Sequence, residues 1–173
     1  MHVLVATDGK LDPNRVADFA VRLAGSDGMV TVVTVIEIPR RLLSDLREVM
    51  GQMPATEILD VDAEYVDVAG ASIETPRAWP GDDAVLRRYL DDKRLEYTGP
   101  IADAVREHGI QTQGEAIDSE KTAESILSRA EEIDADVIVI GSHGLGAFEG
   151  LLGSVGTKIV RRSNRPVLLL RVS

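Results

Sequence analysis

The sequence contains no cysteine and only three histidines, and these absences limit the chemistry available to the protein. Without cysteine there can be no disulfide bond, no thiolate nucleophile and no zinc–thiolate site. The histidines, His2, His108 and His143, are scattered along the chain and lack the spacing of metal ligands. We therefore expect no structural metal ion.

Long apolar runs are also absent, although 44% of the residues are hydrophobic. No stretch approaches the roughly 20 apolar residues that cross a bilayer. The sequence begins with the strand-like HVLVAT and not with a signal-peptide pattern. These features predict a cytoplasmic protein without a membrane partner, and a length of 173 residues suits one compact domain.

Positive charge is scarce, because the formal net charge is -10 at pH 7. Such a balance argues against nonspecific binding to nucleic acid or to anionic lipid. Residues 141–173 differ from the rest, since their only acidic residue is Glu149. Their basic residues are Lys158, Arg161, Arg162, Arg165 and Arg171. This region is either a solvated helix with cations near its C-terminus or an anion-binding site.

Apolar runs alternate with amphipathic stretches at both ends of the chain. Strands are predicted at 2–7, 29–38, 110–117, 135–140 and 167–172. Helices are predicted at 13–24, at 123–133 and from 154 to about 163. The first is capped by Asp12 with Pro13 at its first position, and Asp118, Ser119 and Thr122 are possible caps of the second. The alternation of strands and helices indicates a parallel sheet with helices on both faces.

The middle of the chain is less regular. A helical stripe covers 40–53, and apolar and acidic residues alternate over 58–68 as in a half-exposed strand. A further helix starts at Asp82, and Gly99-Pro100 is expected to break or restart it. We interpret residues 39–81 as an enlarged connection, a lid or a dimer arm, within a single domain of residues 1–173.

The stretch GSHGLGAFEGLLGSVGTKI, residues 141–159, places six glycines directly after a buried strand. It does not fit the dinucleotide fingerprint G-x-G-x-x-G, which belongs to the first strand–helix turn, and it lacks the spacing of a Walker A loop. What remains is a strand that ends in Gly141-x-x-Gly144 and a helix opened by Gly153-Ser154. Backbone free of Cβ atoms and a helix N-terminus suit a phosphate group.

This segment resembles the universal stress protein family, whose nucleotide-binding members carry G-x2-G-x9-G-[ST] between the fourth strand and the fourth helix. The resemblance extends to HVLVATDG, VVTVIE, ADVIVIGSHG, GSVGTKIV and RPVLLL, roughly residues 1–38 and 110–173. It implies a three-layer α/β fold with a five-stranded parallel sheet in the order 3-2-1-4-5. It also implies reversible binding of an adenine nucleotide, ATP or AMP, with Mg²⁺ only beside ATP, in a stress-response or regulatory role. A homodimer through the C-terminal strand VLLLRV is implied as well.

In the resembled family, adenine lies near the positions of Asp8 and Val35, and the phosphates lie near Gly144 and the helix that starts at Ser154. The candidate nucleotide-binding residues are Ala6, Thr7, Asp8, Val35, Ile140, Gly141, His143, Gly144, Gly153, Ser154, Val155 and Gly156. Each position also allows a purely structural role: tight turns for the glycines, a helix cap for Ser154, a turn cap for Asp8 and an exposed loop for His143. Lys10, where many family members have serine, is either a surface lysine or a phosphate contact.

The sequence departs from the family pattern within the motif itself. Eight residues, LGAFEGLL, separate Gly144 from Gly153 where the nucleotide-binding members have nine. One residue of chain moves an amide by up to ~3.5 Å, whereas a hydrogen bond fails beyond ~3.2 Å, so Gly146 and Gly150 must let the shorter loop close. The alternative is a dimeric interaction module that binds no nucleotide. No catalytic constellation emerges, and any ATP hydrolysis would be slow and incidental.

Overall fold

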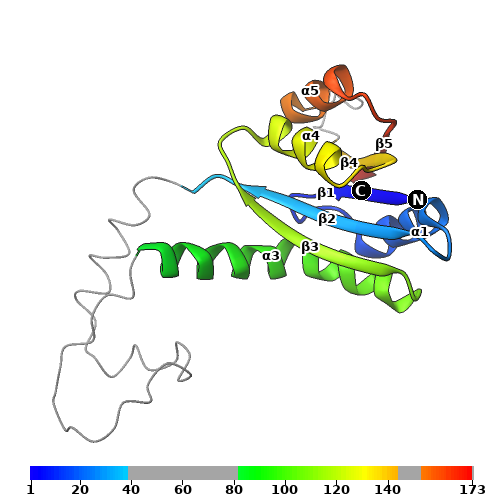
Figure 1. Cartoon of the computed structure of the whole chain (residues 1–173), viewed down its shortest axis with the longest axis horizontal. Helices are drawn as coiled ribbons and strands as arrows, with labels where there is room; N and C mark the ends of the chain where they lie inside the picture. The colour runs from blue at the N-terminus through cyan, green and yellow to red at the C-terminus, as the bar shows by residue number, and fades with distance from the viewer. Residues whose placement is uncertain (39–81, 144–152, 173) are drawn as a thin grey trace, which may run out of the picture. The chain divides into compact units, whose positions relative to one another are not determined.

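The computed structural model describes residues 1–38, 82–143 and 153–172, and within them the fold is a parallel α/β sheet covered by helices (Figure 1). The strands are β1 (His2–Ala6), β2 (Met29–Ile36), β3 (Gln111–Asp118), β4 (Val137–His143) and β5 (Val167–Val172). The helices are α1 (Pro13–Ala24), α3 (Asp82–Glu107), α4 (Thr122–Glu132) and α5 (Ser154–Arg162). The strand order is β3-β2-β1-β4-β5, which confirms the expected topology.

The chain divides into two compact units, residues 1–37 with 88–173, and residues 38–87. The second unit contains Ile38 and the first residues of α3 among the positions that the structure describes. The predicted helix at 40–53, the predicted strand at 58–68 and the proposed lid or dimer arm at 39–81 lie outside the described residues.

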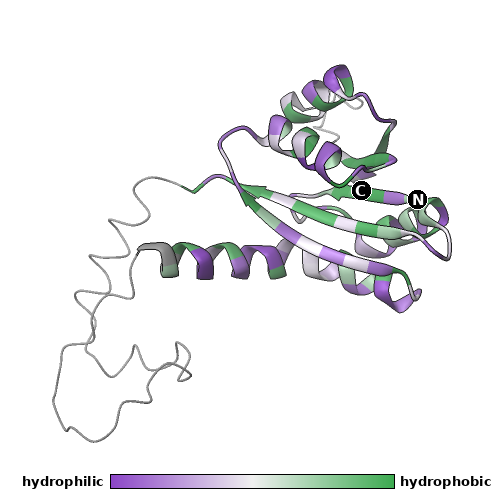
Figure 2. Ribbon diagram, viewed as in Figure 1, coloured by the Kyte–Doolittle hydropathy of each residue, from purple (hydrophilic) through white to green (hydrophobic). Residues whose placement is uncertain are grey.

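The sheet buries two separate apolar layers because neighbouring side chains of a strand point to opposite faces. On one face, Val3 and Val5 of β1 pack with α1 and with the part of α3 that includes Ile101. On the other face, Leu4 packs with residues of α4 and α5 such as Ile159. Figure 2 shows the contrast between the hydrophobic central strands and the hydrophilic edge strand β3. The expectation of helices on both faces is therefore confirmed.

Helix α3 is continuous through Gly99-Pro100, so the prediction that this dipeptide breaks the helix was wrong. Proline removes one backbone donor at a cost of roughly 3 kcal/mol. Packing of the helix opposes that cost, because Ile101, directly after the proline, is 1% exposed. Burial of the helix face against the sheet thus outweighs the local signal.

The same helix approaches β3 closely at one glycine. A Cβ atom placed on Gly114 would lie 2.5 Å from Oγ1 of Thr98, closer than van der Waals contact permits. Thr98 is itself 1% exposed and so has no room to retreat. The glycine in this strand therefore permits the contact between the sheet and α3.

The helix starts agree with the sequence in one case and differ in two. Asp12 caps α1, since its side chain accepts from the amide of Arg15 at 2.8 Å. In α5 the cap position belongs to Gly153, and Ser154, predicted as a possible cap, is the first helical residue. In α4 the cap position belongs to Lys121, without a side-chain capping bond, so none of the suggested caps Asp118, Ser119 and Thr122 fills that role.

Candidate functional site

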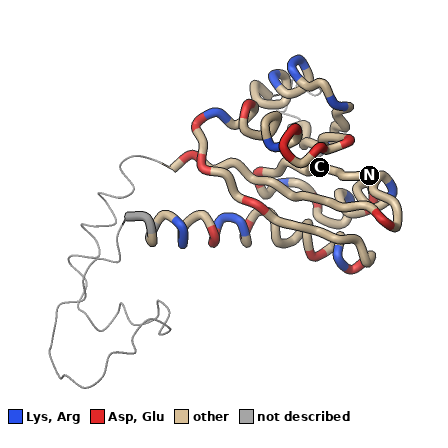
Figure 3. The backbone as a smooth tube through the Cα atoms, viewed as in Figure 1, with Lys and Arg blue, Asp and Glu red and all other residues tan. Residues whose placement is uncertain are grey.

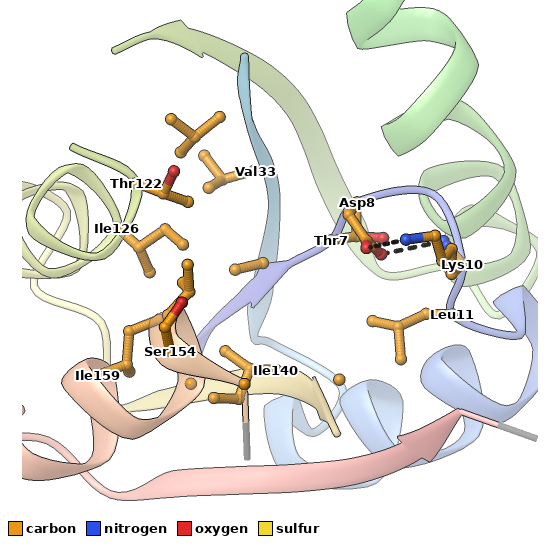
Figure 4. A pocket seen from close by; sticks show the side chains of 16 residues that line it. Thr7, Asp8, Lys10, Leu11, Val33, Thr122, Ile126, Ile140, Ser154 and Ile159 are labelled. Carbon is orange, nitrogen blue, oxygen red and sulfur yellow. Dashed lines mark hydrogen bonds and ion pairs between the residues drawn. The ribbon is translucent and has the colours of Figure 1, made fainter. Parts of the chain in front are cut away.

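A pocket of about 340 Å³ opens at the carboxyl ends of the central strands (Figure 4). Its lining comes from the ends of β1, β2 and β4, the loop after β1, and the first turns of α4 and α5. The lining residues are Ala6, Thr7, Asp8, Lys10, Leu11, Val33, Val35, Thr122, Ile126, Ile140, Gly141, Gly153, Ser154, Val155, Gly156 and Ile159. From β1 the chain turns outward first to β2 and later to β4, so the pocket lies at the switch point where open α/β sheets bind ligands.

The inner wall of the pocket is apolar and closely packed. Val33 of β2 is 0% exposed, and Ile126 and Ile159 are 5% and 1% exposed. The amide of Thr7 donates to the carbonyl of Val33 at 2.9 Å and thereby extends the pairing of β1 and β2 into the pocket floor. A flat, largely apolar group can be buried here with little loss of protein hydrogen bonding.

The loop after β1 forms a compact turn at one end of the pocket. The amide of Gly9 donates to Thr7 Oγ1 at 3.0 Å, and the amide of Lys10 donates to Asp8 Oδ1 at 3.3 Å. Gly9 has a φ of +82°, a conformation that side chains disfavour, and the ring of Tyr97 from α3 lies against it. The turn-capping role suggested for Asp8 is confirmed, and it holds the carboxylate at the pocket edge.

The start of α5 forms another part of the pocket. The first amides of an α-helix have no carbonyl four residues earlier to bind. In α5 the first backbone bond runs from the amide of Thr157 to the carbonyl of Gly153 at 2.9 Å, so the amides of Ser154, Val155 and Gly156 precede it. All three residues line the pocket. Such amides, together with the partial positive charge of the helix start, favour an anion.

Charged side chains also join the two helices beside the pocket. Glu124 of α4 accepts from Arg162 Nη1 of α5 at 2.8 Å. The pKa of the Glu124 carboxyl is lowered, chiefly by its bond to a backbone amide at the start of α4 and further by Lys158 and Arg162. Figure 3 shows basic residues along α5. These basic residues lie in the middle and the last turn of α5, away from the helix start that lines the pocket.

The structure brings ten of the twelve predicted site residues to this pocket. The two others are His143, which ends β4 but whose side chain the structure does not describe, and Gly144, which lies outside the described residues. The shortened loop between Gly144 and Gly153 lies outside them as well. The prediction did not include Leu11, Val33, Thr122, Ile126 and Ile159, and it named Lys10 only as one of two alternatives.

Two of the lining residues that the prediction did not include, Ile126 and Val33, lie in apolar patterns that the sequence shows. Ile126 belongs to an apolar helical stripe, and Val33 belongs to a strand that is apolar on both faces. Residues of this kind are read as core, and only the strand order shows that α4 lies beside the end of β2. The wall of the pocket is therefore formed by residues of the hydrophobic core.

Two absences apply to the described part of the chain. None of its helices is long and apolar enough to span a bilayer. Its histidine, aspartate and glutamate side chains form no group of three or more that could hold a metal ion.

Comparison with known proteins places this architecture in a family. A model of the universal stress protein family matches residues 1–171. Universal stress protein MJ0577 of Methanocaldococcus jannaschii is 43% identical over 49 residues, 28% of this chain and 30% of that protein. A universal stress protein of Thermus aquaticus, from the QAH/OAS sulfhydrylase 3′ region, is 38% identical over 81 residues, 46% of this chain and 59% of that protein. These alignments span less than two thirds of the relatives' lengths.

Solved structures resemble the fold over almost the whole chain. The structure of MJ0577 has a TM-score of 0.61 at 18% identity and covers 99% of this chain and 96% of its own. The universal stress protein from Archaeoglobus fulgidus in complex with dAMP has a TM-score of 0.53 at 22% identity, covering 98% and 96%. A universal stress protein family protein from Arabidopsis thaliana with AMP bound has a TM-score of 0.53 at 14% identity, covering 100% and 92%. The match over residues 1–171 and the shared fold establish that this chain belongs to the universal stress protein family.

Proposed function

We propose that the protein binds an adenine nucleotide, ATP or AMP, reversibly in this pocket and acts in a stress-response or regulatory role. The observation that carries the proposal is the junction of three chemically different surfaces in one cavity. These are the apolar wall at Val33 and Ile126, the carboxylate of Asp8, and the amides at the start of α5.

Each surface suits one part of a nucleotide. The apolar wall offers burial to the base, and the Asp8 carboxylate can accept hydrogen bonds from the adenosine. The amides of Ser154, Val155 and Gly156 are suited to phosphate oxygens. The volume of about 340 Å³ falls in the range of small-molecule pockets. Two structural neighbours in the same family were solved with dAMP and with AMP, which supports the choice of adenine nucleotides.

The direct test is isothermal titration calorimetry with ATP, ADP and AMP, together with thermal melting at millimolar nucleotide. ATP is titrated with and without Mg²⁺, because the metal would enter only with the triphosphate. We expect saturable heat and a rise in melting temperature. The absence of both would reject nucleotide binding and leave a dimeric interaction module as the function.

A matched pair of substitutions at Gly153 separates loss of binding from loss of fold. Gly153 has a φ of -59°, and a Cβ atom there meets no atom of the described residues within 4 Å, so these residues leave room for a side chain. Asparagine and aspartate are both good helix caps, and they differ by one negative charge. We expect Gly153→Asp to bind ATP at least ~10-fold more weakly than Gly153→Asn, because its carboxylate repels the phosphates.

Melting of both variants without ligand provides the control. Melting temperatures close to that of the wild-type protein would show that the helix start is intact. Equal ATP affinity in the two variants would place the phosphates away from α5 and contradict this part of the proposal.

We further infer that the partner in a homodimer is a second copy bound through β5. This strand is at the end of the sheet order, and its sequence VLLLRV is far more apolar than that of the other edge strand, β3. An apolar edge strand presents unpaired backbone groups that favour pairing with another chain.

A further inference from the structure

Lys10 lines the pocket, and among the lining residues of the described chain it has the only cationic side chain. Its ammonium group lies 3.0 Å from Asp8 Oδ2. Figure 4 shows the two side chains meeting at one end of the pocket, across from Ser154 at the start of α5. The charged lining of the described pocket therefore consists of one carboxylate and one ammonium group in contact.

The pair is arranged so that the cation remains available to a ligand. The side chains of Lys10 and Asp8 are 67% and 48% exposed, so their mutual attraction is weakened by solvent. A lysine ammonium has three N–H donors, and one bond to Asp8 leaves capacity for another acceptor. Its flexible stem lets the ammonium group turn toward a ligand inside the pocket while it stays near Asp8.

The base of that stem, by contrast, is fixed. The amide of Lys10 donates to Asp8 Oδ1 at 3.3 Å, and the preceding residue, Gly9, is held at a φ of +82° with the ring of Tyr97 against it. The turn therefore fixes where the Lys10 side chain starts at the pocket edge, and the four-carbon stem keeps its rotatable bonds.

The negative charge around the pocket makes the Lys10 ammonium group important for the binding of a phosphate. The chain carries a formal net charge of -10, and the Asp8 carboxylate lies in the pocket itself. A phosphate chain in the pocket is repelled by that carboxylate, and the described lining offers Lys10 as a cationic side chain that opposes the repulsion. The repulsion grows with each phosphate that the ligand carries.

We propose that Lys10 determines the pocket's selectivity for phosphate number, by donating to a phosphate oxygen while it also neutralises Asp8. This inference rests on the proposed nucleotide binding and adds which nucleotides are preferred. Lys10 adds more binding free energy for ligands with more phosphates, and it adds none for adenosine, which has no phosphate. The substrate class favoured by this residue is therefore the di- and triphosphates over the nucleoside.

The test compares adenosine, AMP, ADP and ATP by isothermal titration in the wild-type protein, Lys10→Met and Lys10→Arg. We expect Lys10→Met to lower the affinity for ATP by about 10-fold and the affinity for adenosine by less than about 2-fold. The losses for AMP and ADP should lie between these values. Lys10→Arg keeps the charge and should retain the wild-type order. The preference of the wild-type protein for ATP over adenosine should fall as ionic strength is raised.

Arg106→Met serves as the charge-matched control. Arg106 pairs with Asp103 in the last turn of α3 and is not among the lining residues of the described pocket. The Arg106→Met substitution removes one positive charge from the protein without altering the site, and it should leave the affinities for all four ligands unchanged.

Three outcomes are distinguishable. If Lys10→Met keeps the wild-type ratio of ATP to adenosine affinity, the selectivity role is wrong while nucleotide binding stands. If Lys10→Met weakens all four ligands equally, Lys10 only braces the Asp8 turn, and the inference is again overturned. If the wild-type protein binds none of them, the proposed function fails and this inference fails with it.

Discussion

At the scale of single residues, the turn after β1 shows how a local signal and a distant contact act on one position. Asp8-Gly9 is a turn pair in the sequence, and the φ of +82° at Gly9 agrees with it. The sequence does not show that a ring from α3 covers this glycine. A Cβ atom on Gly9 would lie 2.8 Å from Cδ1 of Tyr97.

We therefore predict that Gly9→Ala destabilises the protein more than Gly25→Ala does. Gly25 has a φ of +72° and a ψ of 177°, and a Cβ atom there meets no described atom within 4 Å. The Gly25 variant thus measures the strain of a backbone conformation that is almost exclusive to glycine, about 1–3 kcal/mol. Gly9→Ala adds overlap with Tyr97, about 1–3 kcal/mol more. Urea denaturation of both variants measures the difference, and equal midpoints would show that the ring moves aside freely.

At the scale of secondary-structure elements, the contact between α3 and β3 depends on a glycine in the strand rather than on the glycine in the helix. Gly114 faces Thr98 with no space for a methyl group, whereas a Cβ atom on Gly99 would meet nothing within 4 Å. By local propensity, glycine destabilises both the strand that contains Gly114 and the helix that contains Gly99. Packing requires a glycine only at position 114.

We predict opposite effects for the two alanine substitutions. Gly114→Ala should lower the free energy of unfolding by about 1–3 kcal/mol, because its methyl group forces α3 away from the sheet. Gly99→Ala should raise it by up to about 1 kcal/mol, because alanine is the better helix former. Chemical denaturation followed by circular dichroism provides the measurement. Destabilisation by Gly99→Ala would indicate that the helix needs glycine beside Pro100.

The elements also show where sequence reasoning succeeds and where it stops. The strand VLLLRV and the helix from Pro13 to Ala24 were predicted with the observed bounds, because an apolar run or a cap with proline marks their ends locally. Helix α3 was predicted as broken because Gly99-Pro100 is a strong local signal. Its continuity comes from burial of residues such as Ile101 against the sheet, which no local pattern contains.

At the scale of the whole molecule, the candidate site could be predicted in its polar part and not in its apolar part. Asp8 and the start of α5 carry motifs that can be read from the sequence. The wall formed by Val33 and Ile126 depends on the order of strands in the sheet, which came from the family resemblance and not from periodicity. The loop between Gly144 and Gly153 has one residue fewer than the family pattern. Its closure onto a phosphate stays a prediction, because Gly144 and its neighbours lie outside the described residues.

Assembly into a homodimer is tested at this same scale. Leu169 of β5 is 41% exposed, a large apolar side chain on the edge strand proposed as the interface. We predict that Leu169→Asp yields a monomer in size-exclusion chromatography with light scattering. Phe19→Asp is the control, because Phe19 is exposed to a similar extent, 37%, on α1. A dimer that survives Leu169→Asp but not Phe19→Asp would place the interface on the helical face.

The pairing of β1 between β2 and β4 has a consequence for the order in which the protein folds. Val3 pairs with Val30 nearby in sequence and with Val137 far along the chain. Closure of long loops is slow, so the pairing with β2 should precede the pairing with β4. During synthesis, the first two strands can meet long before the helix start at Ser154 emerges from the ribosome. A nascent chain would therefore be unable to form the proposed nucleotide site until the segment around Ser154 had been translated and had left the ribosome.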